Sequence, residues 1–501
     1  MITARADAPV AARAVIRESL VLGAWLLVAC AIAAATLRAH VMWFDEVQAW
    51  NIARASRSLT DLFANVRYEG HPALWYLVLY AVSRVTGDPR AMQVVEWCVM
   101  CATFAVVLFR APFPRWARAT AIGGYFVAFE YGVVSRNYGL GLLLLVVALA
   151  ALHRAPARPG LAAGVPLALL AWTSLAGALV VTVVVVAVAW ERRSRPVARW
   201  AGALLVVAAG AALTCIPPSD FASFSAGIPS SPLAALTPTR VLGAATGPWR
   251  GLVPLPVQVG AWNTNLLDRF AGARVLEAVL SLVLVVLVGR ALERGSVARR
   301  IWVLGAVAFF GYSLVVVQPD RAHYAGVWFV LFLACAWLAC SERHFATSPS
   351  APVPLVALVA SVLAVQCAAT FAILVPATTH DFSSGEALAA VIARQGLARD
   401  VVSGHDYDAT TIGAYLDRPV YSAARREWIR YFVGNRRTVD AYAAATATDL
   451  VCRASALAAV RRRDVAYVVD QRLPERFHVT ELGSELGVYV YRVRAGLAVC
   501  G

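Results

Sequence analysis

Acidic and histidine side chains follow the first long apolar stretch of the chain. Asp45 and Glu46 form an adjacent pair, and Glu69 and His71 come shortly afterwards. Ionisable groups are costly beside lipid, so groups at the end of an apolar helix indicate a site that faces water or headgroups. A carboxylate there can deprotonate an acceptor hydroxyl or hold a cation. Adjacent helical residues point about 100° apart, so only one of the pair can face a common cavity, and we expect it to be Asp45.

Both motifs also have a purely structural interpretation. An aspartate at the start of an interfacial helix accepts hydrogen bonds from backbone N–H groups and caps the helix. The segment Glu69-Gly70-His71-Pro72 then only starts the next helix, where proline is favoured in the first turn. In the functional interpretation, Gly70 allows a tight approach of the backbone, while Glu69 and His71 place an acid and a titratable donor beside Asp45.

Two further polar clusters lie between apolar stretches. One contains Arg136 and Tyr138, and the other contains Arg321, His323 and Tyr324. An arginine between apolar helices commonly extends its charged group to the lipid headgroups. Alternatively, a guanidinium group binds a phosphate through two parallel hydrogen bonds. Because both clusters are expected on the same side of the membrane as the first motif, together they favour an anionic lipid headgroup as the ligand.

Apolar residues dominate the composition. Of 501 residues, 60% are hydrophobic and 15% are charged, whereas about a quarter of the residues in soluble domains are charged. The formal net charge of +15 would suit nucleic-acid binding, but basic pairs such as Arg192-Arg193 and Arg299-Arg300 lie between apolar stretches. Cytoplasmic loops of membrane proteins concentrate positive charge in this way. We therefore predict a multi-pass α-helical protein of the membrane bilayer, with no nucleic-acid partner.

Most apolar stretches are long enough to cross about 30 Å of hydrocarbon. They lie near 20–38, 71–86, 91–109, 117–134, 138–153, 200–216, 271–289, 301–317, 322–340 and 352–376. The run 161–190 has basic residues at both ends, which predicts two short helices with a break near Trp172-Thr173-Ser174. Such breaks are tolerated where the backbone lines a cavity enclosed by protein. We expect about 11–13 spans.

The positive charges predict which segments face the cytoplasm. The segments placed inside are Arg110 to Arg118, the 154–158, 191–199 and 290–300 loops and Arg343; those placed outside are 39–70, 135–138, 217–270, 318–321 and everything after 377. One conflict remains, because two apolar runs separate His71 outside from Arg110 inside. Either one run re-enters or lies flat, or Arg110 is outside.

The chain divides into a membrane module, residues 1–376, and a C-terminal domain, residues 377–501. In the first, 45–66 has the periodicity of helices that lie in the interface. The outer loop 217–270 carries Trp249 and Trp262, whose rings favour the headgroup level. In the second, an amphipathic helix at 386–395 and short strands at 400–403, 465–470 and 488–493 predict a small soluble α/β domain.

The cysteines give little indication of metal binding. Cys98 and Cys101 lie inside an apolar stretch without a second pair of ligands, so packing is favoured over zinc. Cys452 and Cys500 lie in the polar C-terminal region. A disulfide between them is permitted if that region is extracytoplasmic, and the sequence leaves this open.

Taken together, these motifs resemble those of the GT-C glycosyltransferases. Asp45-Glu46 after the first span, His71-Pro72 at the next helix, the turn 135–138 and the cluster 321–324 follow the order found in that superfamily. The most similar branch comprises family 39 and the aminoarabinose and dolichyl-phosphate-mannose transferases. The likeness covers roughly residues 15–376, followed by a C-terminal soluble domain, and identifies the superfamily better than the substrate.

The resemblance implies an inverting transfer of a sugar from a polyprenyl-phosphate donor to an acceptor hydroxyl or amine. Asp45 matches the acidic residue at the reaction centre, and His71, Arg136 and Arg321 match basic residues that bind the lipid phosphate. The other residues predicted to contact donor or substrate are Glu46, Glu69, Tyr138, His323 and Tyr324.

The chain departs from the family pattern at two places. One proline follows His71 where many relatives have two, and Ser135-Arg136-Asn137 stands where many have Glu-Ala-Arg. The missing acid leaves a metal site unknown and a divalent cation open as a cofactor. No G-x-G-x-x-G segment is present, which agrees with a donor that carries no nucleotide.

Two other functions compete with a transferase. A transporter or flippase of lipid-linked sugars needs a polar path through the bilayer and usually internal repeats, and the sequence has no obvious repeat. A non-catalytic, lipid-binding assembly subunit could retain the same scaffold. We expect a transferase in the cytoplasmic (inner) membrane whose active site and C-terminal domain face outward. The acceptor is a lipid, a glycan or a protein.

Overall fold

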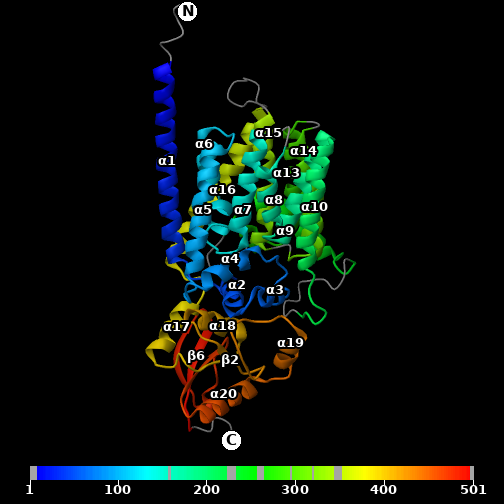
Figure 1. Ribbon diagram of the computed structural model, residues 1–501. Helices are drawn as coiled ribbons and strands as arrows, with labels where there is room; N and C mark the ends of the chain where they lie inside the picture. The colour runs from blue at the N-terminus through cyan, green and yellow to red at the C-terminus, as the bar shows by residue number, and fades with distance from the viewer. Residues whose placement is uncertain are drawn as a thin grey trace, which may run out of the picture.

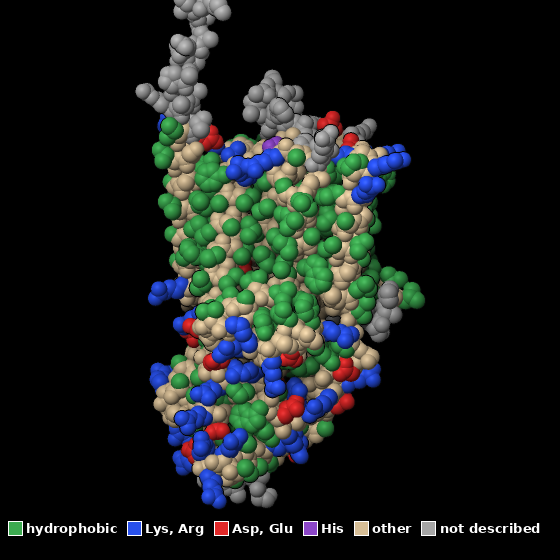
Figure 2. Space-filling view, in the orientation of Figure 1, with side chains coloured by type: hydrophobic (Ala, Val, Ile, Leu, Met, Phe, Trp, Pro, Cys, Tyr) green, Lys and Arg blue, Asp and Glu red, His purple; other side chains and the backbone are tan. Residues whose placement is uncertain are grey.

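Apolar helices form a bundle, and a smaller domain covers one end of it (Figure 1). The computed structural model describes residues 8–155, 159–222, 233–256, 265–293, 296–318, 321–342 and 353–496. Hydrophobic side chains cover the sides of the bundle, while arginines gather at its far end and over the small domain (Figure 2). This distribution is that of a multi-pass membrane protein.

Eight helices of the described residues are long and apolar enough to cross a membrane. They are α1 (Ala8–Ala39), α5 (Ala91–Arg110), α7 (Asn137–Arg154), α9 (Leu175–Arg192), α10 (Arg195–Thr214), α14 (Val297–Val315), α15 (Ala322–Glu342) and α16 (Val353–Thr379). Three further segments lie in the same bundle (Figure 1): α6 (Arg115–Ile122) with the π-helix η1 (Phe126–Glu130), α8 (Leu161–Ala171) and α13 (Ala273–Ala291). The eight candidate spans are fewer than the 11–13 that the sequence predicts, because α6 and α8 contain only 8 and 11 residues and α13 carries three charged side chains.

Three short helices form a layer between the bundle and the small domain (Figure 1). They are α2 (Phe44–Ala55), α3 (Leu59–Val66) and α4 (Leu74–Ser83). The 10 residues of α4 reach only about 15 Å, half of what a span requires. The predicted crossing at 71–86 is therefore wrong, which removes the conflict over Arg110. The segment 45–66 does form two helices, as predicted.

A break at Trp172-Thr173-Ser174 separates α8 from α9, as predicted. The backbone groups that it frees have partners. The Asn137 side-chain amide donates to the Thr173 carbonyl at 2.6 Å, and the Leu74 N–H donates to the Trp172 carbonyl at 3.1 Å. Ser174 caps α9 by accepting from the Gly177 N–H. The break thus supports the starts of α4 and α7.

The loop between α10 and α13 contains α11 (Pro238–Ala245), α12 (Gly247–Leu252) and the 3-10 helix η3 (Leu266–Arg269). Trp249 lies on α12, whereas Trp262 is outside the described residues. Arg250 of α12 is 5% exposed and pairs with Glu277 of α13 at 2.8 Å, and Glu277 is fully buried. Asp268 also pairs with Arg250. This ion-pair cluster fixes the loop to the bundle.

The C-terminal domain is an α/β sheet domain. Its elements are α17 (Gly385–Arg394), β1 (Val401–Ser403), α18 (Asp406–Tyr415), β2 (Val420–Ser422), β3 (Glu427–Ile429), α19 (Arg436–Ala443), α20 (Ala447–Arg461), β4 (Val465–Val469), η4 (Glu475–Phe477), β5 (Thr480–Glu485) and β6 (Val488–Val493). The sheet order is β3-β2-β1-β4-β6-β5, and β1 is parallel to β2 and β4. The predicted helix and all three predicted strands are present.

Cys98 and Cys101 are free thiols on α5, and no group of three His, Cys, Asp or Glu side chains in the described residues could hold a metal ion. Cys452 is disulfide-bonded. Cys500, Arg158, Asp320 and Arg343 lie outside the described residues.

Replacing Glu277 by alanine should destabilise the protein. The change removes one partner of the buried Arg250 guanidinium and leaves Asp268, so we expect a loss of about 3 kcal/mol, at the low end of the cost of breaking a buried pair. Thermal unfolding in detergent measures this as a lower melting temperature. The control is Glu191→Ala, because Glu191 pairs with Arg300 at the surface and such pairs contribute about 1 kcal/mol or less. Equal melting temperatures for both variants would contradict the role of the buried cluster.

Candidate active site

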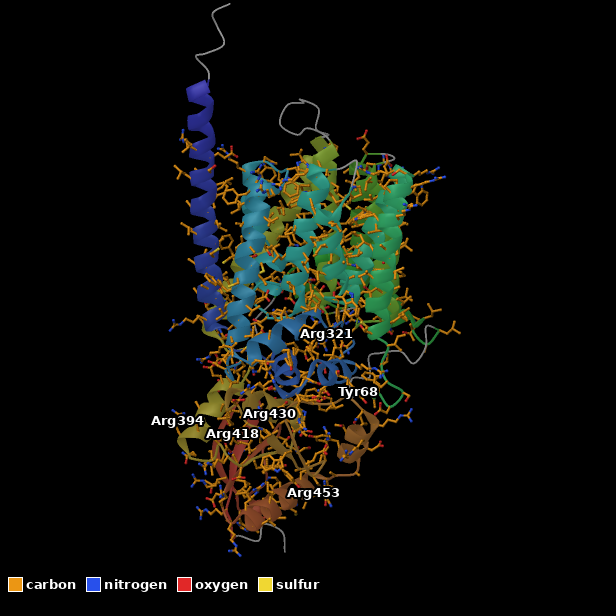
Figure 3. The ribbon with its side chains drawn as sticks, in the orientation of Figure 1. Tyr68, Arg321, Arg394, Arg418, Arg430 and Arg453 are labelled. Carbon is orange, nitrogen blue, oxygen red and sulfur yellow. The ribbon has the colours of Figure 1, made fainter. Side chains whose placement is uncertain are left out.

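A cavity of about 430 Å³ lies where the interfacial helices, the bundle and the C-terminal domain meet. Tyr68 and Arg321 mark this junction in Figure 3. The residues that line it are Trp43, Phe44, Asp45, Gln48, Tyr68, Glu69, His71, Arg136, Phe221, Ala222, Val316, Val317, Gln318, Arg321, His323, Tyr324, Tyr407, Phe432 and Gly434. Most of the predicted site residues are therefore gathered in one place.

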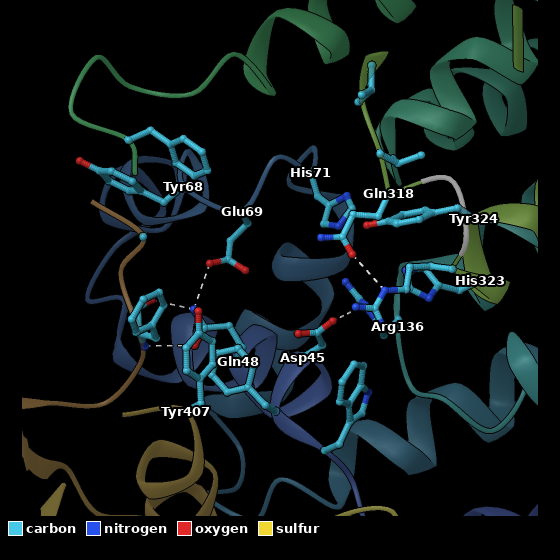
Figure 4. Close-up of a pocket in the computed structure, with 18 of the residues that line it drawn as sticks. Asp45, Gln48, Tyr68, Glu69, His71, Arg136, Gln318, His323, Tyr324 and Tyr407 are labelled. Carbon is cyan, nitrogen blue, oxygen red and sulfur yellow. Dashed lines mark hydrogen bonds and ion pairs between the residues drawn. The ribbon is translucent and has the colours of Figure 1, made fainter. Parts of the chain in front are cut away.

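Asp45 and Arg136 form an ion pair across the cavity wall (Figure 4). The Asp45 Oδ2 and Arg136 Nη1 atoms are 2.9 Å apart, although the residues are 91 positions apart in the chain. Asp45 comes from the first turn of α2, and Arg136 comes from the loop before α7. The carboxylate remains 35% exposed to the cavity, and the guanidinium 15%. The predicted meeting of these two residues is confirmed, and Asp45 is the member of its pair that faces the cavity.

Glu46 points the other way and is fully buried. Its carboxylate accepts from the Ser135 N–H at 2.7 Å and from the Trp43 N–H at 3.1 Å, and it contacts His40 Nε2 at 2.8 Å. Glu46 is absent from the cavity wall, so the predicted contact with donor or substrate is wrong. The hydrogen bond to Trp43 is the helix cap that the structural interpretation assigned to Asp45. Glu46 instead holds the loop that carries Arg136.

Glu69 is held in the cavity by neutral hydrogen-bond donors. Gln48 donates to it at 3.0 Å and the Tyr76 hydroxyl at 3.4 Å. Withdrawal from bulk water raises the pKa of Glu69 to about 7, partly opposed by the Gln48 hydrogen bond and assisted by the charge of Asp45. The positive φ of Gly70, 68°, makes the turn that exposes this segment to the cavity. Glu69 is thus a carboxyl group that titrates near neutral pH.

His71 lies beside Glu69 and carries no positive charge. Burial and the nearby Arg136 lower the pKa of His71 to about 3, so its ring is neutral at physiological pH. Its buried Nδ1 atom has no hydrogen-bond partner among the residues that the structure describes. The sequence predicts a basic phosphate ligand here, whereas the structure gives a neutral group. His71 also borders an apolar recess of about 200 Å³ formed by Phe63, Val66, Arg67, Ala73, Leu213 and Thr214.

The second predicted polar cluster reaches the same cavity from the ends of α14 and α15. Arg321 is exposed to it and donates from Nε to Gln318 Oε1 at 2.9 Å. His323 and Tyr324 also line the wall, and their rings lie on the same side as Arg136 in Figure 4. Tyr138 does not line the cavity, contrary to the prediction. Its ring stacks on Tyr131, and the Arg136 guanidinium carbon lies 5.7 Å from its centroid.

Several cavity residues were missed by the sequence analysis. Gln48 donates to Glu69 and also exchanges hydrogen bonds with the backbone of Phe432, at 2.7 and 3.1 Å. Its place three residues after Asp45 on one helix puts both on one face, and that spacing could have revealed it. Tyr407 and Phe432 come from the C-terminal domain. No local sequence pattern predicts them in the cavity, because their closeness to α2 depends on how the domains dock.

No family model matches the chain, and no curated protein matches it. Among solved structures, the chain is similar to ArnT from Cupriavidus metallidurans bound to undecaprenyl phosphate. The TM-score is 0.50 and the identity 14%, and the match covers 95% of this chain and 98% of ArnT. The similarity shows a shared fold from the membrane bundle to the sheet domain.

Replacing Glu46 by alanine should destabilise the site. The change leaves the buried Ser135 N–H and the partly buried Trp43 N–H without their acceptor, and an unsatisfied buried group costs about 1–3 kcal/mol. Thermal unfolding in detergent should give a clearly lower melting temperature. Glu46→Gln is the matched variant, because the amide oxygen can still accept from Ser135, and we expect a smaller loss. Wild-type stability of Glu46→Ala would show that this carboxylate does not hold the loop.

Proposed function

We propose that the protein is a glycosyltransferase that moves a sugar from a polyprenyl-phosphate donor to an acceptor hydroxyl or amine, with inversion at the sugar carbon. One observation carries the proposal: two carboxylates, Asp45 and Glu69, share a membrane-face cavity with two arginines, Arg136 and Arg321. Such a site combines groups that accept a proton with groups that bind a phosphate. The shared fold with ArnT supports a lipid-linked donor.

The donor phosphate is proposed to bind between Arg136 and Arg321. Both guanidinium groups can pair with phosphate oxygens and stabilise the charge that develops as the phosphate leaves. The neutral His71 can add a hydrogen bond through its unpartnered Nδ1 atom. The apolar recess on the other side of His71 offers space for the first isoprenoid carbons. The proposed binding sites for the headgroup and the lipid tail are therefore adjacent.

The reaction is proposed as a single displacement. The acceptor oxygen or nitrogen forms a bond to the anomeric carbon while the bond from that carbon to the phosphate oxygen breaks. The polyprenyl phosphate leaves with the electron pair, and the acceptor proton passes to a carboxylate. Phosphate binding to Arg136 competes with the Asp45 pair and releases Asp45 toward the acceptor. Glu69 is the second candidate base, because a base is most effective when its pKa lies near the working pH.

The site is proposed to face outward from the cytoplasmic membrane. α7, α9 and α13 end with Arg154, Arg192 and Arg290, and Figure 2 shows arginines at the end of the bundle opposite the small domain. Positive charge at that end favours a cytoplasmic position for it. The cavity and the C-terminal domain then lie outside. A divalent cation remains a proposal that chelation can test.

Asp45→Asn should lower sugar transfer by about 10²–10⁴-fold, because a neutral amide cannot accept the acceptor proton. Transfer is measured in membranes that supply donor and acceptor, and binding of undecaprenyl phosphate is measured on the purified protein. We expect that binding to be retained. The control is Asp61→Asn, which changes an exposed carboxylate of α3 outside the cavity. Unchanged transfer by Asp45→Asn removes this residue from the mechanism, and lipid binding by a wild-type protein that transfers no sugar would favour an assembly subunit.

If Glu69 rather than Asp45 takes the acceptor proton, the rate of transfer should rise with pH through about 7, the pKa of Glu69. A base acts only when deprotonated, so activity is low below that pKa and reaches a plateau above it. Glu69→Gln should abolish this rise. Gln48→Met removes the hydrogen bond that opposes the raised pKa, and should move the midpoint to higher pH. The measurement is kcat/KM against pH, and a midpoint that is the same in wild type and Gln48→Met would contradict the assignment.

A further inference from the structure

The two walls of the cavity differ in chemistry (Figure 4). The only arginines among the described lining residues, Arg136 and Arg321, lie on the wall made by the bundle. The opposite wall contains Phe44 of α2 with Tyr407 and Phe432 of the C-terminal domain. A phosphate is attracted to the first wall, so the second is left for the other substrate.

The second wall is an aromatic cluster of three rings, Phe44, Tyr407 and Phe432. The Tyr407 and Phe432 rings are stacked, with centroids 4.5 Å apart and planes inclined by 24°. Phe44 meets Tyr407 edge to face at 4.2 Å. Gln48 fixes the Phe432 backbone through two hydrogen bonds, so the cluster is held to α2. The two domains build this wall together.

Pyranose rings are suited to such a wall. One face of a pyranose presents C–H groups, which are attracted to the negative face of an aromatic ring, while its edge presents hydroxyls. Glu69 and Gln48 lie beside the aromatic cluster and can bind those hydroxyls. No arginine of the described lining residues lies on this wall to neutralise a phosphorylated acceptor.

Polar groups continue from the aromatic cluster along the sheet domain. The His405 ring is 5.4 Å from Tyr407, and its Nδ1 atom lies 2.6 Å from Asp408. His405 follows β1 and Asp470 follows β4, two adjacent parallel strands whose connections run in opposite directions from β1. Open α/β sheets commonly bind ligands at the carboxyl ends of strands at such a point. An acceptor longer than one sugar can therefore extend along this edge.

We propose that the acceptor is a saccharide and that its ring packs against the aromatic cluster of Phe44, Tyr407 and Phe432. This inference rests on the proposed transferase function and names the substrate class of its second site. The acceptor hydroxyl then points toward Asp45 and Glu69, with the donor phosphate on the far side at Arg136.

Saturation-transfer NMR on the full-length protein in detergent, with undecaprenyl phosphate present, tests the proposal. The probes are methyl pyranosides of glucose, mannose, galactose and N-acetylglucosamine. We expect at least one to receive saturation mainly at the C–H protons of one ring face. Tyr407→Ala should weaken its binding about tenfold, the upper range for one aromatic contact, and Tyr407→Phe should keep it. Phe44→Leu tests the same cluster from α2, without altering the C-terminal domain.

The control is Trp428→Ala, which removes a partly exposed aromatic ring of β3 outside the cavity and should leave binding unchanged. The proposal is overturned if no pyranoside binds, if Tyr407→Ala and Phe44→Leu both bind as well as wild type, or if glycerol 3-phosphate displaces the pyranoside. Binding of undecaprenyl phosphate is measured in the same samples. Its absence from wild type would contradict the transferase itself, whereas its presence with no saccharide bound would contradict only the acceptor class.

Discussion

The architecture depends on one clamp between the first interfacial helix and the loop before α7. Asp45 binds the Arg136 side chain at 2.9 Å, and Glu46 binds the backbone of Ser135 at 2.7 Å. The two acids lie on different faces of α2 and hold neighbouring residues of the same loop. The buried bonds of Glu46 fix where Arg136 stands, since bonds shielded from water are costly to break. Asp45 then meets a guanidinium group whose position is already set.

The layer of short helices, through α2, also positions the C-terminal domain. Residues on α2 bond to that domain at three places: Gln48 to Phe432, Asn51 to Thr410 and Arg54 to Asp417. The first two are buried, which fixes the domain's orientation more firmly than surface ion pairs could. Because one helix carries Asp45 and also docks the sheet domain, α2 fixes the position of Asp45 relative to the aromatic cluster.

Local sequence patterns predicted the features that depend on neighbouring residues, such as helix faces, breaks and strands. The 100° offset between adjacent helical residues predicted that only one of Asp45 and Glu46 faces the cavity. The basic residues at both ends of 161–190 predicted a pair of helices with a break. The strands of the C-terminal domain followed from short apolar runs. In contrast, the apolar composition of 71–86 predicts a span, because composition does not reveal that only 10 of these residues form the helix α4.

The remaining site features depend on burial and on distant contacts, which no local pattern contains. Gln48 and Phe432 are 384 positions apart, so their pairing follows only from domain docking. The sequence predicts a cation at His71, whereas burial beside Arg136 lowers the pKa of the ring and makes it neutral. This burial cannot be read from the neighbouring residues in the sequence. Glu46 looked equivalent to Asp45, although its partners are backbone groups on the other side of α2.

This distribution of charge bears on the order of events in the cavity. Before a phosphate is present, Arg136 is neutralised by Asp45, which leaves exposed Arg321 as the cation available at the mouth. In the proposed reaction, a donor phosphodiester drawn in by Arg321 competes with Asp45 for Arg136, because its two unsubstituted oxygens can accept two parallel hydrogen bonds from the guanidinium group. On the proposed function, Asp45 is then released when the donor binds. Such coupling would keep the base occupied in the empty site and available in the loaded one.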